Sequence, residues 1–170
     1  MVSLNKISSD KGNSIFNKKN FICLLLITVV FILDRISKLE IIDKQINNNV
    51  IYVNDFINFE LIWNTGIGFG LLSSSSSLIY NLLTALIGGI IIFLIYLLVS
   101  LKFLDKILFS IIIGGALGNV YDRIVYYAVP DFIDIHYKNF HWFTFNIADI
   151  FITVGILLLI LKDVLFKHEK

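Results

Sequence analysis

Cysteine is nearly absent from this sequence of 170 residues, and charged residues are scarce. The one cysteine, Cys23, excludes an intramolecular disulfide and leaves no cysteine or histidine partner at the spacing that cysteine metal sites use. Because Cys23 lies in an apolar run, we expect it to be a packing residue that faces lipid. Charged residues account for only 16% of the chain and the formal net charge is +1. No basic stripe interleaved with aromatic residues occurs, so nucleic acid is not an expected partner.

What the chain has in excess is apolar sequence. Hydrophobic residues make up 57%, against about 45–50% in soluble domains, which predicts a membrane protein. A helix needs about 20 apolar residues to cross a hydrocarbon core of about 30 Å. Four runs of that order occur, at about 21–42, 78–101, 107–127 and 147–166. No small-residue cleavage site follows the first run, so we expect it to stay as a helix. The predicted fold is an all-α integral membrane protein with four transmembrane helices, in a single membrane domain over residues 1–170.

Lysine and arginine collect in the short cytoplasmic loops of membrane proteins. In this chain lysines collect before the first run, between the second and the third, and at the end of the fourth: Lys6, Lys11, Lys18, Lys19, Lys102, Lys106, Lys162, Lys167 and Lys170. Lys102 and Lys106 are expected in the tight connection between the second and third helices. Both termini, including the tail at 1–20, are therefore predicted to be cytoplasmic. The segments at 43–77 and 128–146 would face outward, and chemistry on an exported substrate would take place there.

The first outer segment contains apolar residues in alternation, at Ile51 and Val53 and again at Phe59, Leu61 and Trp63. Such alternation predicts a half-buried hairpin, which would form a small β-like platform on the bilayer surface. The serine run at 73–77 is interpreted as a polar loop that caps the start of the second helix rather than as a catalytic element.

Ionisable side chains inside a membrane segment cost about 2.5–3.5 kcal/mol each on insertion scales, so each needs a partner or a function. The predicted topology places one group in the outer half of the membrane: Asp34, Arg35, Lys38, Asp122, Arg123 and Asp149, with Asp131 just beyond the third helix. Asp34 and Lys38 are four residues apart and can form an ion pair, an interpretation that stands beside direct catalysis. Asp122 and Arg123 point in different directions on a helix, so we expect separate partners and a scaffold or substrate-positioning role.

Asp131 and Asp149 differ from the others because neither has a cationic residue three or four positions away. Each is expected at a helix end near the outer interface. Two carboxylates brought together there could not both ionise easily. The pair would then offer a base to activate water and an acid to protonate a carbonyl or a leaving amine. Composition alone favours the simpler account of two separate interfacial carboxylates.

Five short motifs carry a resemblance to a known family. In order they are Asp34-Arg-Ile-Ser-Lys38, Asn64-Thr-Gly-Ile-Gly-Phe69, Gly114-Gly-Ala-Leu-Gly-Asn-Val-Tyr-Asp-Arg123, Pro130-Asp-Phe-Ile133 and Phe145-Asn-Ile-Ala-Asp149. The series spreads over most of the chain and resembles lipoprotein signal peptidase, also called signal peptidase II, a family of aspartyl peptidases. Two positions depart from the family pattern, because Pro130 replaces a usual valine and Gly68 a usual alanine. Neither departure removes a reacting group.

The resemblance implies roles for nine residues of this chain. Asp131 and Asp149 match the catalytic pair of the family. The residues implied to line the site and hold the substrate backbone are Asn64, Asn119, Arg123 and Asn146. The residues implied to matter for the fold or for the shape of the site are Asp34, Lys38 and Asp122.

The implied activity is removal of the signal peptide from a bacterial prolipoprotein whose cysteine carries diacylglycerol, by cleavage before that lipidated cysteine. The family needs neither a metal nor a cofactor, and the expected partners are this substrate and membrane lipid. The implied location is the bacterial cytoplasmic (inner) membrane, with the active site of a monomeric enzyme at the outer face.

Three other functions compete with this one. A metal-dependent membrane peptidase would need a motif such as His-Glu-x-x-His; the chain lacks it, although Asp134, His136 and His141 share an outer segment, where histidines are usually solvated. A serine-lysine peptidase fits poorly, because Ser37 and Lys38 are adjacent rather than facing. A small proton-coupled transporter or channel subunit would use intramembrane carboxylates as relays, but the chain lacks the inverted repeat of many transporters.

Overall fold

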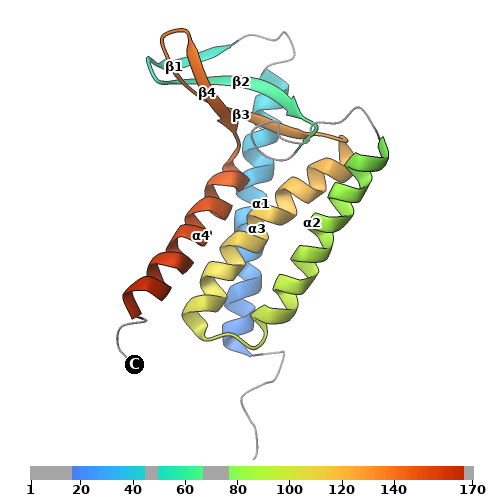
Figure 1. Cartoon of the computed structure of the whole chain (residues 1–170), viewed down its shortest axis with the longest axis vertical. Coiled ribbons are helices and arrows are strands. Elements are labelled where there is room, and N and C mark those ends of the chain that lie inside the picture. Colours follow the sequence, from blue (N-terminus) through green and yellow to red (C-terminus); the bar gives the residue numbers. More distant parts are fainter. Residues whose placement is uncertain (1–16, 45–49, 67–76, 167–170) are drawn as a thin grey trace, which may run out of the picture.

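The computed structural model describes residues 17–44, 50–66 and 77–166 of the chain. These residues form four helices and four strands (Figure 1). The helices are α1 (Lys18–Lys44), α2 (Ser77–Leu98), α3 (Phe103–Val125) and α4 (Ile147–Phe166). The strands are β1 (Ile51–Asn54), β2 (Ile57–Asn64), β3 (Val129–Tyr137) and β4 (Phe140–Phe145). Each apolar run of the sequence therefore contributes one helix, with ends that differ by up to four residues from the expected ones.

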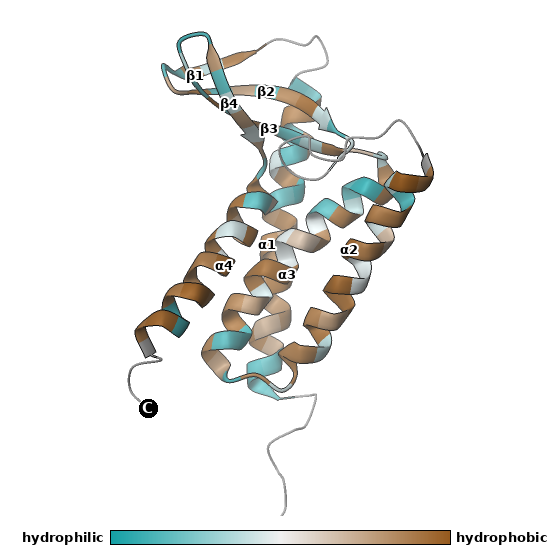
Figure 2. Ribbon diagram, viewed as in Figure 1, coloured by the Kyte–Doolittle hydropathy of each residue, from teal (hydrophilic) through white to brown (hydrophobic). Residues whose placement is uncertain are grey.

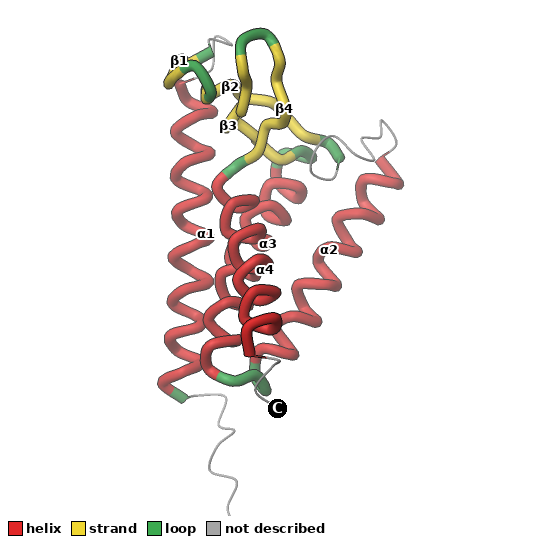
Figure 3. Tube along the Cα trace, turned by 60° about the vertical axis from the view of Figure 1, so that its left-hand side comes forward, coloured by secondary structure: helices red, strands yellow, loops and turns green. Residues whose placement is uncertain are grey.

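The helices form a bundle, and the sheet lies across one end of it (Figure 1). α1 begins and α4 ends at the other end of the bundle, where α2 also connects to α3 (Figure 1). α3 is the central helix, because it contacts α1, α2 and α4. Figure 3 shows α2 leaning away from the other helices as it approaches the sheet end.

The sheet is antiparallel throughout, with its strands in the order β1-β2-β3-β4. It joins two segments that are far apart in the sequence, because β2 pairs with β3, for example at Asn58 and Asp134. The hairpin expected from residues 51–64 is present as β1 and β2. The second hairpin was not expected: Asp131 is the third residue of β3 and not the end of a helix. Most of β3 is buried, so its side chains lack the alternation of polar and apolar residues by which a half-exposed strand is recognised.

The helices carry apolar side chains on their outer surfaces. Figure 2 shows hydrophobic residues along most of each helix and hydrophilic residues near the two ends of the bundle. Within the described residues, two helical spans are long and apolar enough to cross a membrane, Leu78–Leu98 and Phe103–Val125. α1 and α4 are 27 and 20 residues long and also consist largely of apolar residues.

Two residues lie elsewhere than the sequence indicates. Cys23 is only 1% exposed and packs against Ile91, Leu98 and Ile113, so it faces the bundle core and not lipid. Lys106 lies inside α3 and not in the connection before it. Its buried ammonium donates to Asn20 Oδ1 at 2.6 Å and to the Val99 carbonyl at 2.9 Å. A lysine that ties α1, α3 and the α2–α3 connection together gains the partners that its burial requires.

Glycines let α3 approach its two neighbours closely. A Cβ at Gly114 would lie 2.8 Å from Val30 Cβ on α1, and one at Gly115 would lie 2.7 Å from the Ala148 carbonyl oxygen on α4. A Cβ at Gly118 would overlap the carboxylate of Asp34. Small residues at helix contacts are typical of membrane bundles, where packing rather than water exclusion holds helices together.

Candidate active site

The Asp131 carboxylate lies at the junction of the sheet and the bundle, where two asparagines hold it. Asn64 of β2 donates through Nδ2 to Asp131 Oδ2 at 2.9 Å, and Asn146 donates through Nδ2 to Asp131 Oδ1 at 2.6 Å. Asp131 is 4% exposed. Burial raises the pKa of its carboxyl to about 6, and the charge of Asp149 adds to the rise, while the asparagine hydrogen bonds and Lys38 oppose it. A proton on Asp131 is therefore retained to near-neutral pH.

The Asp149 carboxylate is fixed by the start of α4. Asn146 immediately precedes this helix, and its Oδ1 accepts the backbone N–H of Asp149 at 3.1 Å. Asp149 Oδ2 in return accepts the backbone N–H of Asn146 at 3.2 Å. This reciprocal arrangement is a capping box, which satisfies two backbone donors that a helix start leaves unpaired. Asn119 of α3 completes the set by donating through Nδ2 to Asp149 Oδ1 at 2.8 Å.

Asn146 thus connects both aspartates. It is fully buried, its amide oxygen caps α4 beside Asp149, and its amide nitrogen donates to Asp131. An asparagine can do this because it carries an acceptor and two donors on one planar group. The local structure at the start of α4 consequently fixes how the two carboxylates are placed relative to each other.

Behind Asp149 lies a buried ion cluster centred on Lys38. The Lys38 ammonium donates to Asp34 Oδ2 at 2.8 Å, Asn119 Oδ1 at 2.9 Å and Asp122 Oδ2 at 2.7 Å, so all three of its hydrogens have acceptors. Lys38, Asp34 and Asp122 are each 0% exposed. Through Asn119, the cluster orients the amide that holds Asp149.

Each carboxylate of the cluster has a further partner. Asp34 Oδ1 accepts the backbone N–H of Ala148 at 3.0 Å, which adds a third satisfied donor to the first turn of α4. Asp122 is paired with Arg35 of α1. The Arg35 guanidinium also lies over the ring of Tyr121, 4.7 Å from its centroid. α1, α3 and α4 are therefore joined by charge at the sheet end of the bundle.

Arg123 points to a different part of the site from its neighbour Asp122, as the sequence predicts. Its Nη2 donates to the Gly66 carbonyl at 2.5 Å and its Nη1 to the Asn119 carbonyl at 3.4 Å. Its Nε is buried and has no hydrogen-bond partner among the described residues. Arg123 thereby connects α3 to the segment that follows β2.

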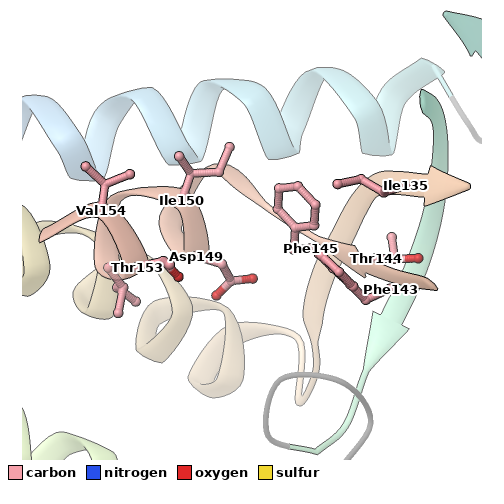
Figure 4. A pocket seen from close by; sticks show the side chains of 9 residues that line it. Ile135, Phe143, Thr144, Phe145, Asp149, Ile150, Thr153 and Val154 are labelled. Carbon is pink, nitrogen blue, oxygen red and sulfur yellow. The ribbon is translucent and has the colours of Figure 1, made fainter. Parts of the chain in front are cut away.

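An apolar pocket of about 440 Å³ opens beside Asp149. It lies between α4 and the β3–β4 hairpin, and Figure 4 shows Asp149 in its wall together with phenylalanine and isoleucine side chains. Its lining residues include Ile135, Phe143, Phe145, Ile150 and Val154. The pocket can take an apolar group next to the Asp149 carboxylate.

Comparison with known proteins identifies the fold and the family. The family model described as signal peptidase (SPase) II matches residues 26–165. The chain belongs to this family. It is 52% identical over 157 residues to a lipoprotein signal peptidase of Pelagibacter ubique (strain HTCC1062), covering 91% of this chain and 95% of that one. It is 45% identical over 136 residues to a lipoprotein signal peptidase of Aquifex aeolicus (strain VF5), covering 78% of this chain and 80% of that one.

Solved structures agree with this membership of the signal peptidase II family. One bacterial membrane enzyme, determined by the in meso method at 1.9 Å resolution, superposes with a TM-score of 0.69 at 28% identity and covers 84% of this chain and 92% of that chain. A second, at 2.3 Å resolution, gives a TM-score of 0.66 at 28% identity, covering 85% and 90%. The sequence resemblance to signal peptidase II is thus confirmed, and the four helices with their sheet are the architecture of a bacterial membrane enzyme.

The residues singled out from the sequence of this signal peptidase II gather in one place. One connected set of contacts contains all nine: Asp131, Asp149, Asn64, Asn119, Asn146, Arg123, Asp34, Lys38 and Asp122. Gly68 and Ser73–Ser76 lie outside the described residues. The sequence indicates only that Arg35 is a charged residue within a membrane helix. It does not indicate that Arg35 pairs with Asp122, which lies 87 positions away.

The histidines behave differently from solvated loop residues. His136 is only 7% exposed, and His141 Nδ1 lies 2.7 Å from Asp134 Oδ2. The expectation of a solvated side chain is therefore wrong for His136, which is buried in β3, whereas His141 of β4 is exposed and contacts Asp134. Among the described residues, no group of three or more histidine, cysteine, aspartate or glutamate side chains is arranged to hold a metal ion.

Proposed function

We propose that this chain is an aspartic-type endopeptidase that removes the signal peptide from diacylglyceryl-modified bacterial prolipoproteins by cleaving before the lipidated cysteine. Asp131 and Asp149 are the catalytic residues of this proposal. The observation that carries it is the double role of Asn146, which caps α4 beside Asp149 and donates to Asp131. Membership of the signal peptidase II family and relatives named lipoprotein signal peptidase support the substrate class.

The two carboxylates have environments that suit different roles. Asp131 keeps a proton to about pH 6 because it is buried, which suits it to act as the acid that protonates the scissile carbonyl oxygen. Asp149 lies in the first turn of α4, where the helix dipole and two hydrogen-bond donors stabilise a carboxylate. We assign Asp149 the role of the base that takes a proton from the attacking water. As the tetrahedral intermediate collapses, Asp149 gives this proton to the leaving amine and Asp131 recovers its own from the hydroxyl of the intermediate. In this proposal Asn64, which contacts Asp131, and Arg123 would hold the substrate backbone.

The placement in the membrane is part of the proposal. All four helices would span the bilayer, including α1, whose charges Asp34 and Lys38 are enclosed and paired and so cost less than isolated charges. The chain would act as one domain and as a monomer. Both termini would be cytoplasmic and the sheet outside, because the start of α1, the α2–α3 connection and the end of α4, which carry lysines, lie at the end of the bundle away from the sheet. The pocket beside Asp149 would then face the outer leaflet, where it fits an apolar part of the lipid-modified substrate.

The other functions have less support. The comparisons offer nothing for a transporter or channel subunit. A serine-lysine peptidase is disfavoured because every hydrogen of the Lys38 ammonium already has an acceptor, and Ser37 Oγ donates to the Asp34 carbonyl. Neither side chain is available to activate the other.

The test is cleavage of a diacylglyceryl-modified prolipoprotein by purified full-length enzyme, followed by gel shift. Asp131→Asn and Asp149→Asn should each lower the rate by about 10²–10⁴-fold, because each removes one partner in proton transfer. The double variant should be hardly slower than the slower single variant, because the two groups act as a unit.

A matched control is Glu40→Gln, which removes an exposed carboxylate that pairs only with Lys44. Such a pair contributes little to stability, so this variant should cleave at the wild-type rate. Wild-type rates in both aspartate variants would refute the catalytic pair. If one of the two variants loses its thermal stability together with its activity and the other does not, the residue replaced in the first variant has a structural role.

A further inference from the structure

Three ionisable side chains outside the active site share one face of the sheet. Asp134 and His136 are two residues apart on β3, so their side chains point to the same side. His141 of β4 is the direct cross-strand partner of His136. The proposed peptidase mechanism uses none of these three side chains.

A β-bulge brings His141 to this face. In the β3–β4 register, Ile135 pairs with Phe143 and His136 pairs with His141, so one step on β3 corresponds to two on β4. The extra residue is Trp142. In a regular ladder without the bulge, His141 would pair with Tyr137 and point to the same side as Phe143, toward the apolar pocket. Bulges often re-aim a side chain at a functional position, and here the bulge creates a pair of facing imidazoles.

Asp134 fixes how His141 is presented. The Asp134 carboxylate is 1% exposed, and its Oδ2 lies 2.7 Å from His141 Nδ1. A carboxylate only accepts, so Nδ1 carries the hydrogen and the lone pair of neutral His141 is on Nε2. Metal-binding histidines usually have this arrangement, in which a carboxylate orients the ring and strengthens its basicity.

His136 provides the second nitrogen. It is more than nine-tenths buried, and neither of its ring nitrogens has a hydrogen-bond partner among the described residues. The His136 and His141 rings lie 5.4 Å apart between centroids. Two imidazoles on one tetrahedral Zn²⁺, at a Zn–N distance of about 2.0 Å, would have centroids about 5 Å apart. The observed separation of the rings is compatible with two ligands of one ion.

We propose that His136 and His141 form a two-histidine site for a divalent transition-metal ion such as Zn²⁺, with Asp134 as the residue that orients His141. Water would complete the coordination. The bound ion would link β3 to β4 and so stiffen the strand that carries Asp131. It would not take part in peptide cleavage, because both ligands lie outside the set of contacts around Asp131 and Asp149.

The experiment is a titration of tag-free, full-length protein in detergent with Zn²⁺ alone, followed by calorimetry and by thermal unfolding. Wild type should bind one ion and unfold at a higher temperature when Zn²⁺ is present. His141→Ala and His136→Ala should each lose this binding. Asp134→Asn should weaken it by about 10–100-fold, because it removes the carboxylate behind the ligand. His168→Ala, which removes the third histidine of the chain, is the matched control and should bind Zn²⁺ as wild type does.

Cleavage assays separate this site from the peptidase. His141→Ala, whose side chain is about half exposed, should stay folded and process the prolipoprotein, and a chelator should leave wild-type cleavage unchanged. Equal Zn²⁺ affinity in wild type and in the His136→Ala/His141→Ala double variant would overturn the metal site, as would failure of wild type to bind Zn²⁺. Neither result would affect the aspartate pair.

Discussion

At the scale of single residues, the site depends on Asn146 being an asparagine. Serine or threonine at this position could cap α4 but would have no amide to reach Asp131. Aspartate could also cap the helix, but would bring a third carboxylate to within about 3 Å of Asp131, where like charges repel. One side chain therefore meets a local requirement of the helix and a chemical requirement of the site.

The raised pKa of Asp131 leads to a prediction for the pH dependence of cleavage. A carboxyl whose pKa is raised to about 6 is protonated below that pH and loses its proton above it. If Asp131 is the acid, kcat/KM should fall about tenfold per pH unit above an apparent pKa near 6. In the pH profile of kcat, the same fall should begin at a higher pH, because bound substrate excludes water from Asp131 and burial favours the neutral form of its carboxyl.

The measurement is a set of cleavage rates from pH 5 to pH 9, with saturating and with limiting prolipoprotein. Glu40→Gln serves as the reference, and its profile should coincide with that of the wild type. A cleavage rate that does not fall as the pH rises toward 9 would show that Asp131 is not the acid, even if the residue proves essential.

At the scale of elements, α3 contacts the three other helices. Substitution of its glycines tests whether this close packing is required. In Gly118→Ala, the new Cβ would overlap the Asp34 carboxylate, which holds Lys38 and the backbone N–H of Ala148. Overpacking of this kind costs about 1–3 kcal/mol of stability. We expect Gly118→Ala to lower the apparent melting temperature in detergent and to slow cleavage, because the start of α4 must shift.

Gly89→Ala in α2 is the matched substitution, since no atom lies within 4 Å of its added Cβ. Alanine favours a helix over glycine by about 0.5–1 kcal/mol, so this variant should be as stable as wild type or slightly more stable. Equal melting temperatures for the two variants would contradict the assigned role of Gly118.

The sequence predicted these elements unevenly, for physical reasons. The helices could be located because each must supply its own run of apolar residues, whatever it packs against. β3 and β4 could not, because β3 is buried through contacts with β2 that form only in the folded chain. Cys23 was placed on the wrong side because an apolar helix gives no sign of which side faces lipid and which faces another helix.

The candidate site divides in the same way. Asn146 and Asp149, with the spacing of a capping box before an apolar run, carry a local signal that can be read from sequence. The Lys38 cluster combines one local pair, Asp34 and Lys38, with partners 81 and 84 positions away. The predicted topology placed the charged members of this cluster in one layer of the membrane, and the motif resemblance indicated that they belong to one site.

At the scale of the whole molecule, the residues of the proposed site are gathered in the layer where the bundle meets the sheet. The Lys38 cluster, both catalytic aspartates of the proposal and the pocket beside Asp149 all lie there. Away from this layer, the helices expose large apolar side chains such as Leu82, Ile92 and Leu157. A soluble protein rarely exposes so much apolar surface, whereas in a bilayer the same surface is solvated by lipid.

This arrangement predicts which connections can be reached from each side of the membrane, and the single cysteine makes the test simple. In a Cys23→Ala background, Lys138→Cys places a thiol in the exposed β3–β4 turn, and Lys102→Cys places one between α2 and α3. In right-side-out membrane vesicles, a membrane-impermeant maleimide should label the cysteine at 138 and not the one at 102. Inverted vesicles should give the opposite result. Each variant should first be shown to cleave prolipoprotein. Labelling of both positions from one side would mean that α3, the one helix between them, does not cross the membrane. That result would refute the four-span topology together with the outward-facing active site.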